Sequence, residues 1–472
     1  MSALEGLRRS GTSQAAWLAG AMIANNVIAL VTSVVFARLL SDYGALAALI
    51  SYLIILTVAG QAMQVTTARE GVLGHLGRGP GLLRTLRAWG GSLALFTAAA
   101  TVISVLARQP IASLLGVAHD PGGTWAAAAG IPAGCLFLGL SILRGALQSV
   151  GDLRSVGLSL IGEQGVRLLT GGPLAALGLG VAGAYLGSLL AYVAMIAYCV
   201  RCLRLAVVHG DSVLPAPDSA RPIRAAVAAR PEAPLPRAAP RLSRHVRDAT
   251  VPIVALAIIQ LLQNVDLIIA KHRMADGLDS SYAVAAVAAK VLIWVAMGAS
   301  FALVPETSRR AAEGEDTRGV LLRTLIVLGA CAIPCLAIFA LAAHPLLAAV
   351  FGSRRAVAAS SLLPLGAAFT VLAATYLAVQ YMLALRRTGF LAAIGLIAVV
   401  EPVLLLTASR RPASFALVVL AIQVLGAALA YALALRRADR PARGADTRRP
   451  LSSAAEAAQR GADPPAVAAD RG

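Results

Sequence analysis

Charged side chains are rare inside the long apolar runs of this sequence, and those that occur there are the residues able to do chemistry. One run contains Glu163 and Arg167, which are four positions apart and therefore lie on one face of a helix, where they can pair. A later run contains Glu401 followed by Pro402, a residue that frees a backbone carbonyl and kinks helices. Because a charge in hydrocarbon is costly, each of these groups is a candidate functional residue.

Two neighbouring runs carry a second charged set. Asp266 lies beside Asn264 in one run, and Lys290 lies in the next. At about 1.5 Å of rise per residue both charges lie within a few turns of the same membrane surface, so their side chains are predicted to meet. Two interpretations stay open: an ion pair that locks two helices, or a cavity site for an anionic head group or a coupling cation. Asn26 and Asn264 are expected to form hydrogen bonds between helices and are also candidate substrate contacts.

Several enzymatic chemistries are excluded by the same survey. A P-loop needs a lysine after a glycine, whereas Lys271 and Lys290 both follow alanine. The sequence contains no GxSxG or HExxH motif and no metal-ligand set beyond the lone pair Cys199 and Cys202. We therefore predict no catalytic residues, no metal, no cofactor and no enzymatic activity.

Composition places these residues in a membrane protein. Of the 472 residues, 58% are hydrophobic and only 14% are charged, whereas soluble domains have about 25% charged residues. The net charge of +18 could suggest a nucleic-acid partner, but aromatic residues for base stacking make up only 5% of the chain. The basic residues lie instead in short segments between apolar runs, which is typical of membrane proteins.

The apolar runs divide the chain into two halves. A helix needs about 20 apolar residues to cross the bilayer, and twelve such runs are found. They cover residues 14–37, 43–67, 89–107, 124–143, 155–179, 181–200, 249–270, 281–304, 324–343, 359–385, 389–407 and 413–435. The predicted parts are a cytoplasmic segment 1–13, a six-helix lobe 14–203, a flexible basic linker 204–247, a second six-helix lobe 248–435 and a disordered tail 436–472.

The distribution of basic residues predicts the orientation. Alternate loops, together with the linker and the tail, carry 31 arginines on one side and 8 basic residues on the other. The positive-inside rule therefore places both termini and the linker in the cytoplasm, in a multi-pass protein of the cytoplasmic (inner) membrane.

The two halves also repeat in sequence. A shift of 238 residues aligns Glu163 with Glu401 and Asn26 with Asn264, and the segment GDLRSVGLSLIGE with GFLAAIGLIAVVE. Each half has an even number of helices, so the repeats have parallel topology. The predicted fold is an all-α membrane protein of about twelve helices, in two pseudo-symmetric lobes around a central cavity.

On these features the chain resembles the polysaccharide transporter (Wzx-type flippase) family of the multidrug/oligosaccharidyl-lipid/polysaccharide exporter superfamily. The likeness is carried by VVFARLLSDYGALAALISYLIIL at 34–56 and by LLQNVDLIIAKHRMADGLDSSYAVAAVAAKVLIW at 261–294. It implies that the lobes open alternately to each side of the membrane and flip a lipid-linked glycan. It further implies that Arg167 and Lys290 meet the anionic head group of that substrate.

The resemblance also sets the alternatives. Asp266 and Glu401 suit a coupling site for H+ or Na+, which fits a cation-coupled exporter of small amphiphiles. A third hypothesis is a non-transporting scaffold that docks glycan-synthesis enzymes through its linker and tail. The first helix has a neutral interior, unlike the basic residue usual in lipid II flippases and the acidic residue common in drug/cation antiporters.

Overall fold

The computed structural model describes residues 11–77, 79–209, 247, 250–313, 315–385 and 387–435, and in these ranges the regular structure is helical throughout. The first half contains α2 (Gly11–Leu39), α3 (Tyr43–Val72), α4 (Pro80–Leu106), α5 (Arg108–Leu114), α6 (Pro121–Ser149), α7 (Leu153–Leu174), the π-helical turn η1 (Ala175–Leu179) and α8 (Gly180–His209). The second half contains α11 (Thr250–Arg273), α12 (Leu278–Ala289), α13 (Val291–Glu313), α14 (Arg318–Phe351), the 3₁₀ segment η3 (Ser353–Ser361), α15 (Leu362–Ala384), α16 (Phe390–Thr407) and α17 (Pro412–Leu435).

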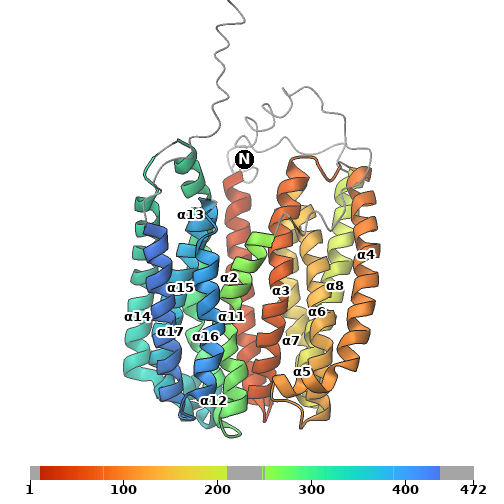
Figure 1. Ribbon diagram of the computed structural model, residues 1–472. Coiled ribbons are helices and arrows are strands. Elements are labelled where there is room, and N and C mark those ends of the chain that lie inside the picture. Colours follow the sequence, from red (N-terminus) through yellow and green to blue (C-terminus); the bar gives the residue numbers. More distant parts are fainter. Residues whose placement is uncertain are drawn as a thin grey trace, which may run out of the picture. The chain divides into compact units, whose positions relative to one another are not determined.

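Eleven helical segments of the described chain are long and apolar enough to cross a membrane. One of them, Leu153–Val207, contains both α7 and α8, which η1 separates, so the segments account for the twelve predicted spans. Figure 1 shows the helices of the first half grouped together and those of the second half grouped beside them. The predicted all-α fold with two lobes of helices is confirmed.

Aspartates begin three of the spans. Asp42, Asp120 and Asp152 each accept hydrogen bonds from backbone N–H groups in the first turn of α3, α6 and α7. These N–H groups have no partner inside the helix, so a carboxylate there both satisfies them and complements the positive end of the helix dipole. The turn before α7 contains Gly151 at φ +85°, which favours glycine. This is the glycine that the repeat aligned with Gly389.

Helices differ in how much of their surface the protein itself covers. In the most apolar window of α3 and of α6, 61% of the residues are buried, compared with 11% in α4 and 17% in α14. Leucines of α4 and α14 are largely exposed, for example Leu95 in α4 and Leu341 in α14. Such a continuous apolar surface is stable against lipid rather than water, which assigns α4 and α14 to lipid-facing positions.

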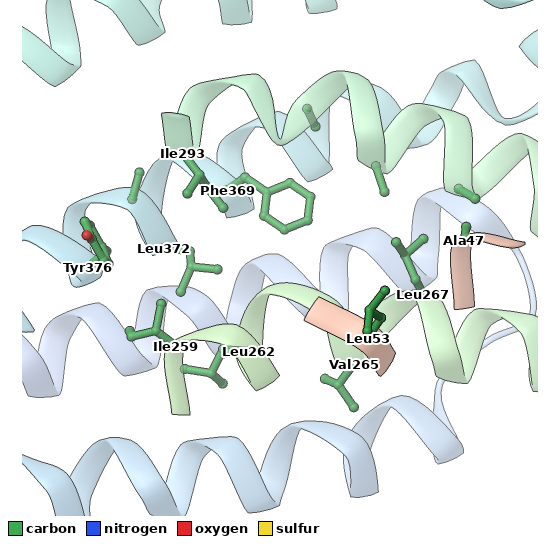
Figure 2. Packing of buried hydrophobic residues seen from close by; sticks show 14 of the residues in the cluster. Ala47, Leu53, Ile259, Leu262, Val265, Leu267, Ile293, Phe369, Leu372 and Tyr376 are labelled. Atoms are coloured by element: carbon green, nitrogen blue, oxygen red, sulfur yellow. The ribbon is translucent and has the colours of Figure 1, made fainter. Parts of the chain in front are cut away.

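The two lobes pack against each other mainly through α3 and α11, and α12 also contacts α3. Figure 2 shows this region: Ala47 and Leu53 of α3 lie beside Val265 and Leu267 of α11, and the cluster continues to Phe369 of α15. All of these side chains are buried. The central helices of the two lobes therefore share one apolar core.

Two predicted helix boundaries were wrong. The span predicted at 281–304 is interrupted at Lys290, which ends α12 before α13 begins. The span predicted at 324–343 continues to Phe351 after a bend at Ala342, three residues before Pro345, whose ring removes a helical hydrogen bond. The predicted linker begins inside α8, which runs to His209; apart from Arg247, the rest of the linker and the tail 436–472 lie outside the described residues.

Candidate functional site

Glu163 of α7 forms a buried ion pair, but its partner is Arg144 rather than the predicted Arg167. Arg144 Nη2 lies 2.9 Å from Glu163 Oε2, and the Arg144 side chain is 1% exposed. Arg144 also donates to Ser159, through Nε to Oγ at 2.8 Å and through Nη2 to the carbonyl oxygen at 2.9 Å. The pair joins α6 to α7, so it braces two helices and not one.

The sequence contains only an indirect signal for this pair. Arg144 follows the apolar run 124–143 directly and was therefore assigned to a cytoplasmic loop. In the structure it lies within α6, where its guanidinium is enclosed. An arginine normally marks the end of a span in sequence. That the helix continues past Arg144 can be predicted only if the acidic partner of this arginine on another helix is already known.

Arg167 is left without a carboxylate. No ion pair involves it in the described part of the chain, and its Nε has no hydrogen-bond partner there. It acts electrostatically on three buried tyrosines, Tyr43, Tyr185 and Tyr192. Arg167 is half-buried. Guanidinium donors that are not already occupied can bind an anion through charge-assisted hydrogen bonds.

The second lobe places Lys290 beside Asn264. Lys290 Nζ donates to Asn264 Oδ1 at 3.1 Å and lies 5.5 Å from the centre of the Phe369 ring. Asn264 in turn donates to the Gln260 carbonyl at 2.9 Å. The expected interhelical hydrogen bond of Asn264 is therefore present, and a lysine supplies it.

Asp266 and Glu401 form the acidic part of the same lobe. Asp266 accepts a hydrogen bond from the Tyr282 hydroxyl at 3.2 Å, and it interacts electrostatically with Lys290 and with Glu401. Glu401 accepts from Gln423 Nε2 at 3.2 and 3.3 Å. The predicted approach of Asp266 and Lys290 is thus found, although the lysine's hydrogen bond goes to Asn264. Sequence analysis missed Tyr282 and Gln423, whose roles depend on neighbouring helices.

Unsatisfied oxygens accompany these acids. Asp266 Oδ1, Gln260 Oε1 and Gln263 Oε1 are buried on α11 and have no hydrogen-bond partner among the described residues. Buried oxygens normally bind a donor, a water or an ion. Within the described ranges no group of three or more His, Cys, Asp and Glu residues could hold a metal ion.

Asn26 lies on α2, apart from these clusters. It accepts a hydrogen bond from its neighbour Asn25 at 3.2 Å and is partly buried. This bond is within one helix, not between two. Its role in substrate binding stays a prediction.

A third charged group, which sequence analysis did not single out, ties the two lobes together. Lys271 of α11 donates to Asp42 of the first lobe at 2.8 and 3.0 Å and to Asp279 of α12 at 2.9 Å. Gly44 permits this approach, because a Cβ there would lie 2.1 Å from the Asp279 carboxylate. The Gly44 N–H donates to Ser280 Oγ at 2.9 Å. We call Asp42, Lys271 and Asp279 the inter-lobe clamp.

Two arginines reinforce the clamp by capping helix ends across the lobe boundary. Arg355 of η3 donates to carbonyl oxygens at the end of α2, including Ser41 at 2.9 Å. Arg38 of α2 donates to the Ala349 and Val350 carbonyls at the end of α14, at 2.8 and 3.0 Å. A cation at a helix C-terminus satisfies orphan carbonyls and complements the dipole. These bonds lie at the end predicted to face away from the cytoplasm, where Figure 1 shows α5 and α12.

Solved structures of membrane transporters share this arrangement of helices. The lipid II flippase MurJ in an inward closed conformation has a TM-score of 0.66 at 12% identity, covering 88% of this chain and 87% of that one. An inward-facing multidrug resistance MATE family transporter of the MOP superfamily has a TM-score of 0.60 at 13% identity, covering 87% and 94%. The MATE transporter ClbM in complex with Rb+ has a TM-score of 0.52 at 15% identity, covering 88% and 93%.

No protein-family model and no curated protein sequence matches the chain. The similarity is therefore one of three-dimensional structure and extends over nearly the whole described chain. This chain has a fold that it shares with the lipid II flippase MurJ and with MATE family transporters.

Proposed function

We propose that this protein is a transporter that flips a lipid-linked oligosaccharide or polysaccharide precursor across the cytoplasmic membrane by alternating access. The shared fold supports transport by two lobes that move against each other. The inter-lobe clamp supports a state closed at the end predicted to face outward, which admits substrate from the cytoplasmic side. Alternating access must open the boundary between the two lobes, and the inter-lobe clamp lies at that boundary. A scaffold that does not move would not need a charged contact there.

The observation that carries the substrate class is the unpaired guanidinium of Arg167. Its candidate partner Glu163 is bound by Arg144, so none of the described carboxylates competes with an incoming anion at Arg167. A pyrophosphate offers oxygens at the spacing of the guanidinium donors, and two parallel charge-assisted bonds form between them. Lys290, already bonded to Asn264, is the second candidate contact for the head group.

A second candidate function is a cation-coupled exporter of small amphiphiles. Asp266 and Glu401 favour it, because they lie close enough to interact with each other, and the cation that acts on Asp266 is Lys290. Ion coupling by H+ or Na+ at these acids is compatible with both candidates. Arg167 distinguishes the two candidates, because a small cationic amphiphile is repelled by an unpaired guanidinium, whereas an anionic head group binds it.

The test is transport of a fluorescent polyprenyl-pyrophosphate-linked sugar in proteoliposomes. Arg167→Ala should reduce flipping about tenfold or more, and Arg167→Lys should recover only part of it, because lysine keeps the charge but not the fork. Arg154→Ala is the matched control, since Arg154 is an exposed arginine in the first turn of the same helix.

The melting temperature of each variant separates loss of function from loss of fold. A correctly folded Arg167→Ala protein that flips the lipid at the wild-type rate would contradict the proposal. A wild-type protein that exports a cationic dye and does not flip the lipid, with dye export unchanged in Arg167→Ala, would favour the second candidate.

A further inference from the structure

The two lobes contain corresponding glutamates with different partners. Glu163 in α7 and Glu401 in α16 are 238 residues apart, at the same position of the sequence repeat. Both side chains are buried within membrane-spanning helices. A buried carboxylate must be neutralised by a cation or a proton, or it destabilises the fold. The two lobes can therefore be compared by the group that contacts each glutamate.

In the first lobe the neutralising group is part of the chain. Arg144 makes three hydrogen bonds of 2.8 to 2.9 Å, to Ser159 and Glu163, and only 1% of its side chain is exposed. The bonds to Ser159 orient the guanidinium before it meets the carboxylate. The pair is thus closely bonded, and the donors of Arg144 are directed at Ser159 and Glu163.

Few other charged groups face Glu163. Tyr192 and Cys199 of α8 lie close enough to Glu163 and Arg144 to interact with them, and Arg167 lies one turn along α7. In the described part of α2, which packs on α7, the only titratable residue is Arg38, at the opposite end of that helix. Neither a tyrosine nor a thiol supplies positive charge, so Arg144 alone holds the countercharge by direct contact.

In the second lobe the corresponding positions are apolar. The shift of 238 residues aligns Arg144 with Met382 and Ser159 with Ile397, and both are buried. Glu401 is bonded instead by the neutral amide of Gln423, and the nearest lysine, Lys290, bonds to Asn264. In the described part of the chain no arginine is found bonded to Glu401, and Asp266 is a second acidic group near it.

We propose that Arg144 is a built-in counter-ion that takes the place of an exchangeable cation at Glu163. The first lobe is therefore independent of protons and sodium, and ion coupling is confined to Asp266 and Glu401 of the second lobe. The last clause rests on the proposed transport function; the assignment of Arg144 does not. Arg144 acts through Glu163: because it pairs with this glutamate, only the corresponding Glu401 is left to respond to protons or sodium.

The experiment measures thermal unfolding of purified full-length protein in acidic and alkaline buffers, with sodium chloride or choline chloride. Arg144→Met leaves Glu163 without a countercharge, so its Tm should fall by several degrees in alkaline buffer with choline. Acid or sodium should restore most of that loss, because a proton or Na+ then occupies the vacated position. Glu163→Gln added to Arg144→Met should abolish this new response and recover stability. Arg154→Met serves as the control for loss of an arginine on the surface.

The outcomes are distinct. An Arg144→Met protein that is destabilised equally in all four buffers would overturn the proposal, because Glu163 would then not be a latent cation site. So would a double variant, Arg144→Met with Glu163→Gln, that loses the sodium response of the wild type. If the proposed coupling in the second lobe is wrong, Glu401→Gln leaves the sodium response unchanged, while the Arg144→Met result still stands.

Discussion

In the first lobe the buried glutamate of α7 is bound by an arginine, whereas in the second lobe its counterpart in α16 is bound by an amide. Arg144, Glu163 and Arg167 together carry one excess positive charge, and Lys290, Asp266 and Glu401 carry one excess negative charge. The two lobes repeat a helical pattern, but these two sets of residues inside the membrane spans have opposite formal charges.

This difference shows how duplicated halves acquire separate roles. Helix positions repeat because both halves must satisfy backbone hydrogen bonds within the membrane. Side chains that face the lobe interior are free to differ as long as each buried charge finds a partner. Arg144 of the first half corresponds to Met382 of the second, so only the first of the two glutamates has an arginine partner from this position.

The largest expected effect comes from breaking the closed pair. Glu163→Gln leaves the enclosed guanidinium of Arg144 without its countercharge and should lower the free energy of unfolding by about 3 kcal/mol. Unfolding in denaturing detergent measures this, and Arg144→Met in the same chain should recover most of the loss. An unchanged stability in Glu163→Gln would mean that the ion pair contributes nothing to the fold.

A smaller effect is expected where the lobes meet. Lys271→Met removes the hydrogen bonds to Asp42 and Asp279 and should weaken the closed state by about 1.5–3 kcal/mol. A cysteine placed at the buried Ala47 should then react with a membrane-impermeant maleimide about tenfold faster or more, in a variant without the native cysteines. Arg411→Met, an exposed position, is the control. Equal labelling in both variants would show that the clamp does not hold the lobes together.

The smallest effect on stability is expected at Glu401. Glu401→Gln keeps the shape of the side chain and a hydrogen bond to Gln423, whose neutral amide makes the hydrogen bonds that Glu401 receives in the described chain. The free energy of unfolding should change by less than about 1 kcal/mol. Dependence of transport on the proton or sodium gradient should nevertheless be lost. A loss of stability as large as that of Glu163→Gln would remove the contrast between the lobes.

Much of the fold follows from the sequence because the bilayer leaves few choices. Apolar runs of about 20 residues must form helices, since every backbone group needs a partner inside its own segment. The repeat between the segments ending in Glu163 and Glu401 indicates two lobes without any structural information. The break at Lys290 was not predicted, because the residues around it are ordinary helix formers.

The candidate site followed from the sequence only in part. Composition and spacing identified the buried charges themselves, because each stands out in an apolar run: Arg167, Glu163, Lys290, Asp266 and Glu401. Helical spacing then paired Glu163 with Arg167, four residues away, although the true partner is 19 residues away on another helix. The partner of Lys271 in the first lobe is 229 residues away.

The sequence by itself determined where helices cross the membrane, that they form two related halves, and which charges stand inside the apolar runs. Hydrophobicity and backbone satisfaction are local properties, so they can be read from a single run of residues. Only the tertiary structure decided which charges meet, since this depends on the rotation and depth of each helix against its neighbours. The choice of Arg144 over Arg167 as the partner of Glu163, and with it the division of charge between the lobes, is a property of helix packing.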